Sequence, residues 1–287
     1  MIQDESPVVH RRRLRLELKQ SRQEAGLTQE MVARQMDWSL SKIIRIESGS
    51  VSISRNDLIA LLQLYGVNEP QRVAALVAQG REARRQTWWS EYRTDLPAAY
   101  FQYIEFEMSA ATIHSYEPLI VPDLLQTEEY ASVATEVYRP NLGPSKTRTL
   151  VELQMKRQEI LLSRADPPSL FFVLDEAIIQ RLIAMPKLRR TQLGKLTEMA
   201  ERPGITIEVV PFSAGLHHGI TENFRILEFE EITDGALYFD SARGSIFSHD
   251  GTGDLTGYRD LFKNLREMSL GSMKSRTLLT RVIQEIE

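Results

Sequence analysis

Two short amphipathic segments, each preceded by a hydroxyl residue, stand close together in the first quarter of the 287-residue chain. Thr28 and Ser39 can each accept an otherwise unpaired amide hydrogen, so the sequence predicts helices over residues 28–35 and 39–47. Only three residues separate the two helices. In such an arrangement one helix can lie in the major groove of DNA while the other braces it on the backbone. The spacing therefore predicts a DNA-binding module.

Three further helices are predicted around this pair, because apolar residues recur at helical spacing over residues 11–24, 54–65 and 70–85. Ser54 opens the middle one and Asp57 follows three residues later, which is the pattern of a capping box. An all-α module of this kind needs only about 60 to 70 residues. The chain must therefore contain a second folded unit.

The charge distribution supports two units. Residues 1–85 hold 14 Lys and Arg against 10 Asp and Glu, whereas residues 86–287 hold 21 against 29. Positive charge supplies affinity for DNA phosphates. We therefore predict a DNA-binding domain with a helical linker over residues 1–85 and a second domain over residues 86–287. The basic cluster from Arg11 to Arg15 has two possible roles: it contacts DNA, or it forms a solvated face of its helix.

Composition argues against several protein classes. The chain has no cysteine, which rules out disulfides and thiolate metal sites and suits a reducing cytoplasm. No run approaches the roughly 20 apolar residues of a membrane span, and the N-terminus does not have the form of a signal peptide. No glycine-rich phosphate loop occurs. The sequence therefore predicts a cytoplasmic protein with no membrane contact and no cofactor.

Residues 22–66 resemble the Cro/CI-type (XRE) class of helix-turn-helix repressors. The residues that carry the resemblance are Gly26-Leu27-Thr28-Gln29, then Ile43-Ile44-Arg45-Ile46-Glu47-Ser48-Gly49, then Leu61-Leu62-Gln63-Leu64-Tyr65-Gly66-Val67. The resemblance implies an all-α, lambda-repressor-like fold in which the helix over residues 39–47 reads the major groove. It also implies a homodimer that binds two half-sites of a double-stranded DNA operator.

The same resemblance implies roles for single residues. Gln29 would hold the DNA backbone, and Leu40, Ser41 and Arg45 would face base edges. Leu40 offers only methyl groups, so we expect it to pack on the C5-methyl of a thymine. Arg55 would lean toward the minor groove or its phosphates, with a solvated surface arginine as the alternative. The residues predicted to contact DNA are Thr28, Gln29, Ser39, Leu40, Ser41, Lys42, Arg45 and Arg55.

Arg22 and Glu47 are interpreted as a structural pair. In the resembling repressors an arginine seven residues before the glutamine pairs with a glutamate eighteen residues after it, and both spacings occur here. We therefore favour an internal ion pair between Arg22 and Glu47 over a contact of Arg22 with phosphate. For Trp38, which lies in the turn, the alternatives are that it covers the core or that it stacks on the DNA backbone.

From Trp88 onward the pattern changes to a mixture of helices and strands. Strand, helix, helix and strand in succession over residues 169–210 predict a right-handed βαβ unit. Three later strands alternate apolar and polar residues, as antiparallel strands do when one face is covered. The predicted strands are 169–174, 205–210, 224–229, 236–240 and 245–248, and the predicted helices are 100–115, one starting at Pro122, 144–164, 175–184, 186–200, 254–269 and 272–286. The second domain is therefore of the mixed α/β class.

This second domain resembles the large C-terminal domain of XRE-type regulators of actinomycetes, the WhiJ-like group. The most specific match is Pro122-Asp123-Leu124-Leu125-Gln126-Thr127 followed by Tyr130-Ala131, in which Asp123 stands where the group commonly has glycine. The resemblance implies a regulator of development or secondary metabolism, often encoded beside a small acidic partner protein. Three functions stay open: a regulator controlled by a small-molecule effector or a partner protein, an antitoxin-like protein that sequesters a small partner, and an enzyme fused to a DNA-targeting module.

Three groups of polar residues could suggest an enzyme, and each has a simpler interpretation. Ser248-His249-Asp250 has the composition of a turn, and adjacent side chains diverge instead of forming a triad. His217-His218 lies near two glycines and is typical of a surface loop rather than a metal site. Asp175-Glu176 follows a strand, where acids are expected at a helix start. We therefore predict no catalytic residue and no metal site.

Overall fold

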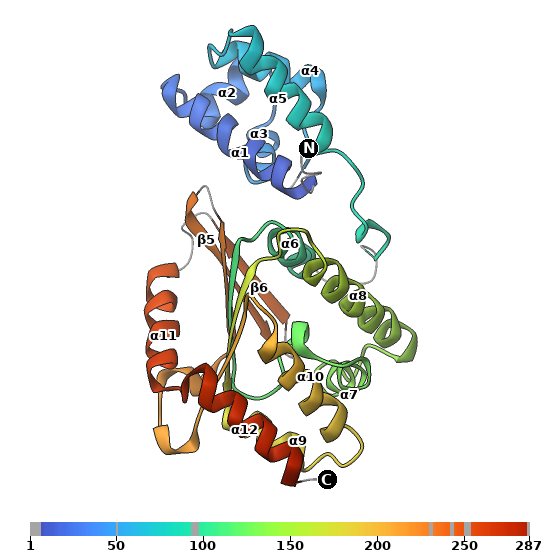
Figure 1. The fold of residues 1–287 in the computed structure, drawn as a ribbon. Helices are drawn as coiled ribbons and strands as arrows, with labels where there is room; N and C mark the ends of the chain where they lie inside the picture. The colour runs from blue at the N-terminus through green and yellow to red at the C-terminus, as the bar shows by residue number, and fades with distance from the viewer. Residues whose placement is uncertain are drawn as a thin grey trace. The chain divides into compact units, whose positions relative to one another are not determined.

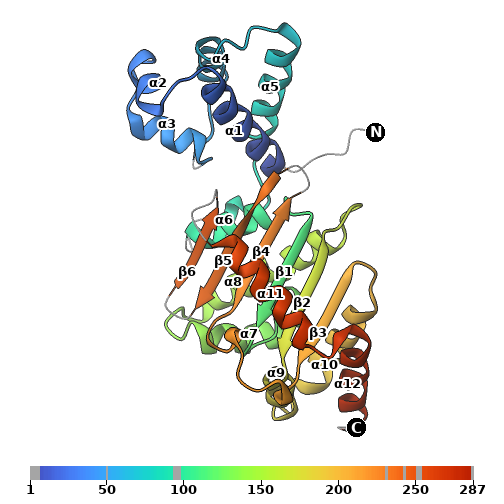
Figure 2. The ribbon, with the colours of Figure 1, turned by 90° about the vertical axis from the view of Figure 1, so that its left-hand side faces the viewer.

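The computed structural model describes residues 7–49, 51–92, 98–229, 232–241, 244–249 and 254–285. The chain divides into two compact units, Met1–Ser90 and Glu91–Glu287 (Figures 1 and 2). The first unit is all-α and the second combines helices with a β-sheet, which confirms the fold class expected from the sequence. Within the described ranges, no helix is both long enough and apolar enough to cross a lipid bilayer.

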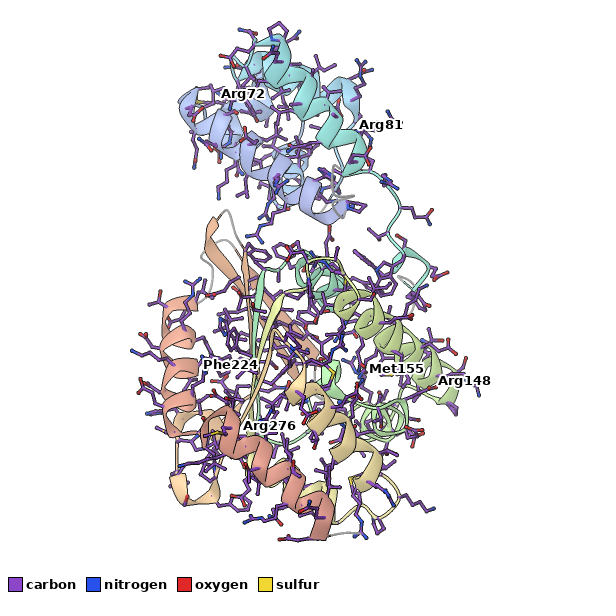
Figure 3. All side chains as sticks on the ribbon, in the orientation of Figure 1. Arg72, Arg81, Arg148, Met155, Phe224 and Arg276 are labelled. Atoms are coloured by element: carbon purple, nitrogen blue, oxygen red, sulfur yellow. The ribbon has the colours of Figure 1, made fainter. Side chains whose placement is uncertain are left out.

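Helices build the first unit. They are α1 (Pro7–Glu24), α2 (Gln29–Gln35), α3 (Leu40–Glu47), α4 (Arg55–Leu64) and α5 (Pro70–Glu82), and Arg81 of α5 is exposed (Figure 3). Thr28, Ser39 and Ser54 precede α2, α3 and α4, and each hydroxyl accepts the amide hydrogen of the residue three positions later, over 3.1–3.2 Å. Each cap satisfies an amide that the helix leaves unpaired, and contributes about 1 kcal/mol. The helix starts predicted at these hydroxyls are confirmed.

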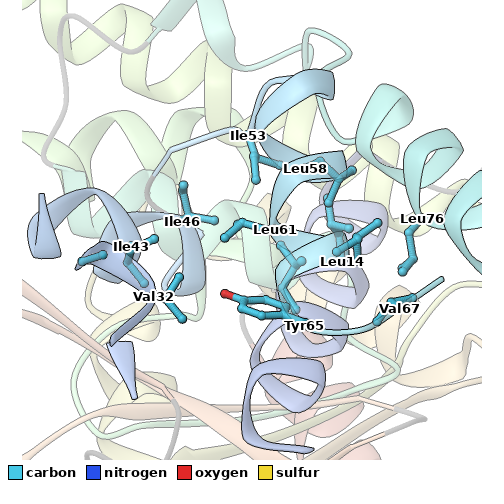
Figure 4. Packing of buried hydrophobic residues seen from close by; sticks show 13 residues of the cluster. Leu14, Val32, Ile43, Ile46, Ile53, Leu58, Leu61, Tyr65, Val67 and Leu76 are labelled. Carbon is cyan, nitrogen blue, oxygen red and sulfur yellow. The ribbon is translucent and has the colours of Figure 1, made fainter. Parts of the chain in front are cut away.

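Apolar side chains of the first unit meet in one core (Figure 4). Val32 of α2, Ile43 of α3 and Leu58 of α4 are each at most 1% exposed. Burying a side chain of this size stabilises the fold by roughly 1.5–3 kcal/mol, so the packing of α2 against α3 is fixed from within. In the turn between them Asp37 has a φ of 54°. This left-handed conformation is one that the short polar side chain of aspartate tolerates better than most.

The second unit is built on a sheet whose described part has six strands in the order β3-β2-β1-β4-β5-β6 (Figure 2). The strands are β1 (Thr112–Glu117), β2 (Ser169–Asp175), β3 (Ile205–Val210), β4 (Phe224–Phe229), β5 (Ile232–Ser241) and β6 (Gly244–His249). β1, β2 and β3 pair in parallel, whereas β4, β5 and β6 continue antiparallel from β1. β1 therefore joins the parallel half of the sheet to the antiparallel half.

Helices cover both faces of this sheet. They are α6 (Ala98–Glu107), α7 (Glu128–Tyr138), α8 (Pro144–Leu162), α9 (Glu176–Ile183), α10 (Arg189–Glu201), α11 (Leu255–Met268) and α12 (Gly271–Glu285). α11 crosses one face, where its Phe262 meets the buried Phe224 edge to face with ring centres 6.3 Å apart (Figures 2 and 3). On the opposite face lie α6, α7 and α8 (Figures 1 and 2). α9 and α10 connect β2 to β3, and α12 packs against β3 and α10.

The structure corrects the helix predicted over residues 100–115. α6 ends at Glu107, and the last part of that segment belongs to β1. Tyr116 and Glu117 of this strand are at most 1% exposed although they point to opposite faces. Within the mispredicted part, Ile113 and Ser115 are buried and Thr112 and His114 are half-buried. Because a serine occupies a buried position, the residue types do not alternate as they do in a typical half-buried strand. The helical prediction was wrong for this reason.

The helix predicted from Pro122 also starts later than expected. A 3-10 turn occupies Asp123–Leu125, and α7 begins only at Glu128. Thr127 caps α7, because its hydroxyl accepts the amide hydrogen of Tyr130 over 3.3 Å. The turn directs the side chain of Asp123 into the interior of the unit, where its exposed fraction is 17%.

Asp123 lies between two buried arginines. Its Oδ2 is 2.5 Å from Nη2 of Arg157, and its Oδ1 is 3.2 Å from Nη2 of Arg225. Arg157 also pairs with Glu107 over 2.9 Å, and Arg225 pairs with Glu117 over 3.0 Å. These five side chains, the buried charge network, come from α6, β1, the 3-10 turn, α8 and β4. The network therefore ties the helices to the centre of the sheet.

Aromatic rings complete the surroundings of the network. Tyr103 of α6 stacks on Tyr238 of β5 with ring centres 4.1 Å apart, and its hydroxyl donates to Glu107. The guanidinium group of Arg225 lies 5.3 Å from the centre of the Tyr103 ring, within the range of a cation–π interaction. Buried charges are tolerated when they are paired and hydrogen-bonded, and the rings supply part of this compensation.

The buried charge network contains three carboxylates and two guanidinium groups, so it holds one carboxylate in excess. Burial raises the pKa of Glu117 to about 7, although Arg225 acts in the opposite direction. Burial also acts to raise the pKa of Asp123, but the charges of Arg157 and Arg225 outweigh it and the pKa is lowered. Burial also raises the pKa of Glu107, although Arg157 acts in the opposite direction. Glu117 and Glu107 are therefore the two groups whose protonation would balance the charge of the network.

We expect the free energy of unfolding of the second unit to fall as the pH rises from about 4.5 to about 7. The pKa of Glu117 is raised from an ordinary 4.5 to about 7, so the folded state binds this proton more tightly than the unfolded chain does. Its stabilising contribution is fully present below the unfolded pKa and is lost as the pH passes the folded pKa, a change of about 3 kcal/mol. Glu117→Gln keeps the side chain neutral and should flatten this dependence.

Calorimetric melting of the full chain at a series of pH values measures the effect. Glu159→Gln is the control, because Glu159 is an exposed carboxylate on α8 close to Arg157 in sequence. This control should keep the pH dependence of the parent. A Glu117→Gln protein that keeps it too would show that Glu117 does not titrate with a raised pKa.

Candidate nucleic-acid interface

One face of α3 is exposed to solvent, and the other is buried in the core. Its exposed residues are Leu40, Ser41, Ile44 and Arg45. Because an α-helix turns by about 100° per residue, these positions fall on one continuous face. Ile43 and Ile46 lie on the opposite side and are 1% and 5% exposed. The structure therefore brings together the three residues predicted to face base edges and adds a fourth.

Ile44 is the residue that the sequence interpretation missed. It stands beside Ile43 in an apolar run, so residue type alone places both in the core. In the structure Ile44 is 45% exposed. The signal that could have identified it is the spacing of four residues from Leu40, since residues four apart lie on the same face of a helix.

Gln29, at the start of α2, is held by the last residue of α3. Its Nε2 donates to Oε2 of Glu47 over 2.8 Å. The neighbouring Thr28 uses its hydroxyl as the cap of α2. Gln29 and Thr28, which are predicted to contact DNA at this point, are thus positioned by contacts within the unit.

Arg22 and Glu47 form a two-point ion pair. Nε of Arg22 donates to Oε1 over 2.6 Å and Nη2 donates to Oε2 over 3.0 Å, a geometry that matches the two planar groups. Arg22 also donates to the carbonyl oxygen of Leu27 over 2.7 Å. The hydrogen bond to Glu47 raises the pKa of Arg22. The pair ties α1 to the end of α3, and a contact of Arg22 with phosphate would require the pair to open.

Lys42 has two partners inside the unit. Its Nζ is 3.1 Å from Oδ2 of Asp57 and 3.4 Å from the centre of the Trp38 ring. Trp38 itself packs against the core. Of the two alternatives for Trp38, the structure shows the one in which the ring covers the core. Contact of Lys42 with DNA stays a prediction.

The other arginines considered for DNA contact differ in their surroundings. Arg55 begins α4, is exposed, and borders a groove of about 750 Å³ between α4 and α5. Arg11 donates to the carbonyl oxygen of Ala83 over 3.0 Å, and Arg15, which is 5% exposed, donates to that of Ser48 over 3.3 Å. These carbonyl groups lie at the ends of α5 and α3, where a positive charge is favourable. Arg11 and Arg15 therefore make internal contacts.

Two family models match the chain. Residues 13–76 match a helix-turn-helix domain, and residues 100–281 match a domain of unknown function, DUF5753, which covers more than half of the chain. The chain belongs to the DUF5753 family. No curated protein and no solved structure matches it. The first unit of this DUF5753 protein contains a helix-turn-helix DNA-binding domain.

The second unit of the DUF5753 protein carries a groove of about 510 Å³ beside α11, lined by residues of the sheet and of that helix. His114 of β1 stacks on Phe171 with ring centres 5.2 Å apart, and its Nε2 is 3.2 Å from Oε2 of Glu228. Glu228 also pairs with Arg259 of α11 over 2.9 Å. The hydrogen bond with His114, together with Arg259, lowers the pKa of Glu228 to about 2. The groove thus combines aromatic rings with charged groups of both signs.

Asp175, Glu176 and His217, which were considered for catalysis or metal binding, have structural partners. Asp175 caps α9 by accepting the amide hydrogen of Ala177 over 2.8 Å, and Glu176 accepts a backbone amide of the turn after β3. His217 was expected on a surface loop, but its side chain is 3% exposed because it packs beside Asp175, with 3.5 Å between Nε2 and Oδ2. Asp250 lies outside the described residues. Within the described ranges, no three His, Asp or Glu side chains are placed to hold a metal ion.

We expect Arg22→Ala or Glu47→Ala to destabilise the first unit by about 3–5 kcal/mol, because each change leaves a buried charge without its partner. The double change should cost less than the sum of the two single changes. Denaturant unfolding followed by tryptophan fluorescence measures this in the full chain, since Trp38, Trp88 and Trp89 all belong to the first unit.

The exposed pair Arg72–Glu17 is the matched control. Its side chains are 38% and 41% exposed and 3.2 Å apart. Breaking it should cost less than about 1 kcal/mol. Additive effects for Arg22 and Glu47, or costs as small as those of the control pair, would contradict a structural role of the buried pair.

Proposed function

We propose that this DUF5753 protein is a sequence-specific DNA-binding transcriptional regulator of the XRE type. In this proposal α3 lies in the major groove, and Leu40, Ser41, Ile44 and Arg45 face the base edges. The observation that supports it best is that one face of α3 is buried in the core and the other is exposed to solvent. A helix held in this way presents a rigid surface, which is what reading a base sequence requires.

Phosphate contacts from neighbouring elements would set the register of α3 on the duplex. The proposed residues are Thr28, Gln29, Ser39, Lys42 and Arg55. Gln29 donates to Glu47 through its amide group, which has a second donor hydrogen and a carbonyl acceptor. Lys42 gives one of its three donors to Asp57. Both side chains can therefore bind a phosphate without losing the contacts that hold them.

The second unit would supply dimerisation and control. Repressor-type modules bind two half-sites about one helical turn apart, so we propose a homodimer on a double-stranded operator. The groove beside α11 is the proposed site of a small-molecule effector, because it is a concave site in which charged side chains of both signs surround the rings of His114 and Phe262. Acidic residues outnumber basic ones over residues 86–287, and this negative charge disfavours contact of the second unit with DNA. The proposal places the protein in the cytoplasm and includes no catalytic step.

Two variants separate base reading from phosphate binding. Arg45→Ala should weaken binding to a specific duplex by about 1–3 kcal/mol and relax the sequence preference of the protein, if Arg45 forms two hydrogen bonds with a guanine. Gln29→Ala should weaken specific and scrambled duplexes alike, because a phosphate contact carries no sequence information. Gel-shift titrations of the full chain on both duplexes measure these effects. An Arg45→Ala protein with the sequence preference of the parent would show that α3 is not the recognition helix.

A further inference from the structure

Two apolar side chains form a ridge on the open face of α3. Leu40 is 37% exposed and Ile44 is 45% exposed, and four residues separate them. Residues at this spacing lie next to each other on a helix surface. The core of the unit does not account for them, because Ile43 and Ile46 already fill the inner side of α3. The Leu40–Ile44 ridge therefore leaves apolar area in water in the unbound protein.

The DNA major groove, which is the partner proposed for this face, offers one apolar feature. In the major groove each base pair presents hydrogen-bond donors and acceptors, and thymine adds its C5-methyl group. Leucine and isoleucine side chains have no hydrogen-bonding atoms, so donors and acceptors cannot attract them. Burying the ridge against methyl groups removes apolar surface from water on both molecules.

We propose that the Leu40–Ile44 ridge reads two C5-methyl groups on nearby base pairs of each half-site. This inference rests on the proposed function and specifies what the α3 face recognises. Leu40 and Ile44 are the specificity-determining residues for the methyl groups. Ser41 and Arg45 stand beside the ridge and supply the hydrogen bonds to the adjoining bases.

The spacing of the ridge sets the spacing of the methyl groups. Four residues advance about 6 Å along a helix axis, at about 1.5 Å per residue. Successive base pairs are about 3.4 Å apart along DNA. The two side chains therefore reach base pairs that are one or two steps apart. We expect each half-site to contain two A·T pairs at that separation, next to the base pair that Arg45 contacts.

An apolar side chain that packs on a C5-methyl group does not distinguish between the bases that carry this group. Thymine presents an acceptor at O4, whereas 5-methylcytosine presents a donor at N4, and both carry the same C5-methyl group. An apolar side chain that packs on the methyl group should accept both bases. A polar side chain that hydrogen-bonds to thymine would reject 5-methylcytosine, because the donor and acceptor are exchanged.

The experiment begins with duplexes that the full chain selects from a random-sequence pool. Each thymine of the selected half-site is then replaced by uracil, which removes only the methyl group. Affinity should fall about fourfold at each of two positions, as for a buried CH₂-sized group. Both replacements together should cost about 15-fold if they act independently. Replacing the same T·A pairs by C·G should lower affinity, and replacing them by 5-methyl-C·G should restore most of it.

Protein variants assign the two methyl groups. In Leu40→Ala the parent affinity should fall, and one of the two thymines should become insensitive to uracil; Ile44→Ala should do the same for the other. Met31→Ala is the matched control, because Met31 is an apolar side chain of α2 with 42% exposure. It should keep both sensitivities. The melting temperature of each variant shows that it is folded.

Three results would overturn the proposal. They are uracil replacements that all leave affinity unchanged, 5-methylcytosine duplexes that bind no better than cytosine duplexes, and Leu40→Ala and Ile44→Ala proteins that keep the methyl sensitivity of the parent. If these occur while Arg45→Ala still relaxes sequence preference, α3 reads DNA without the ridge and only this inference fails. If the full chain selects no duplex from the pool, the proposed DNA-binding function fails with it.

Discussion

The carboxylate of Glu47 is the contact on which the first unit depends. It accepts two hydrogen bonds from Arg22 of α1 and one from Gln29 of α2, while its own backbone ends α3. Three helices therefore meet at one buried charge, and losing a partner leaves that charge uncompensated. The core holds α3 from one side and this contact holds its end. The face that remains open is the one proposed to contact DNA.

Asp123 has a corresponding position in the second unit, since it bridges two arginines from different elements. β1 connects this network to the rest of the unit, because its residues alternate between the two faces of the sheet. Glu117 points to the face that carries the buried charge network, and His114 points to the face that carries the groove beside α11. The network ties elements together on one side of the sheet, and the groove on the other side is the site proposed for a ligand.

Local signals explain how much of this could be predicted from the sequence. The hydroxyl caps at Thr28 and Ser39 and the helical spacing of apolar residues act within a few positions, so the helices of the first unit were predictable. β1 was not, because its pattern depends on which elements cover its two faces. The bridge between Asp123 and Arg225 joins residues 102 positions apart, and no local pattern indicates it. Ile44 was not predicted to face the bases, although its spacing of four residues from Leu40 places both on one face of the helix.

Amide hydrogen exchange of the full chain, with and without a saturating selected duplex, tests the central claim most directly. We expect slower exchange at the start of α2 and along α3 when DNA is bound, because contact with the duplex opposes local opening of these helices. No comparable change is expected in α11 of the second unit. Unchanged exchange in α3, or slowing confined to the second unit, would contradict the account.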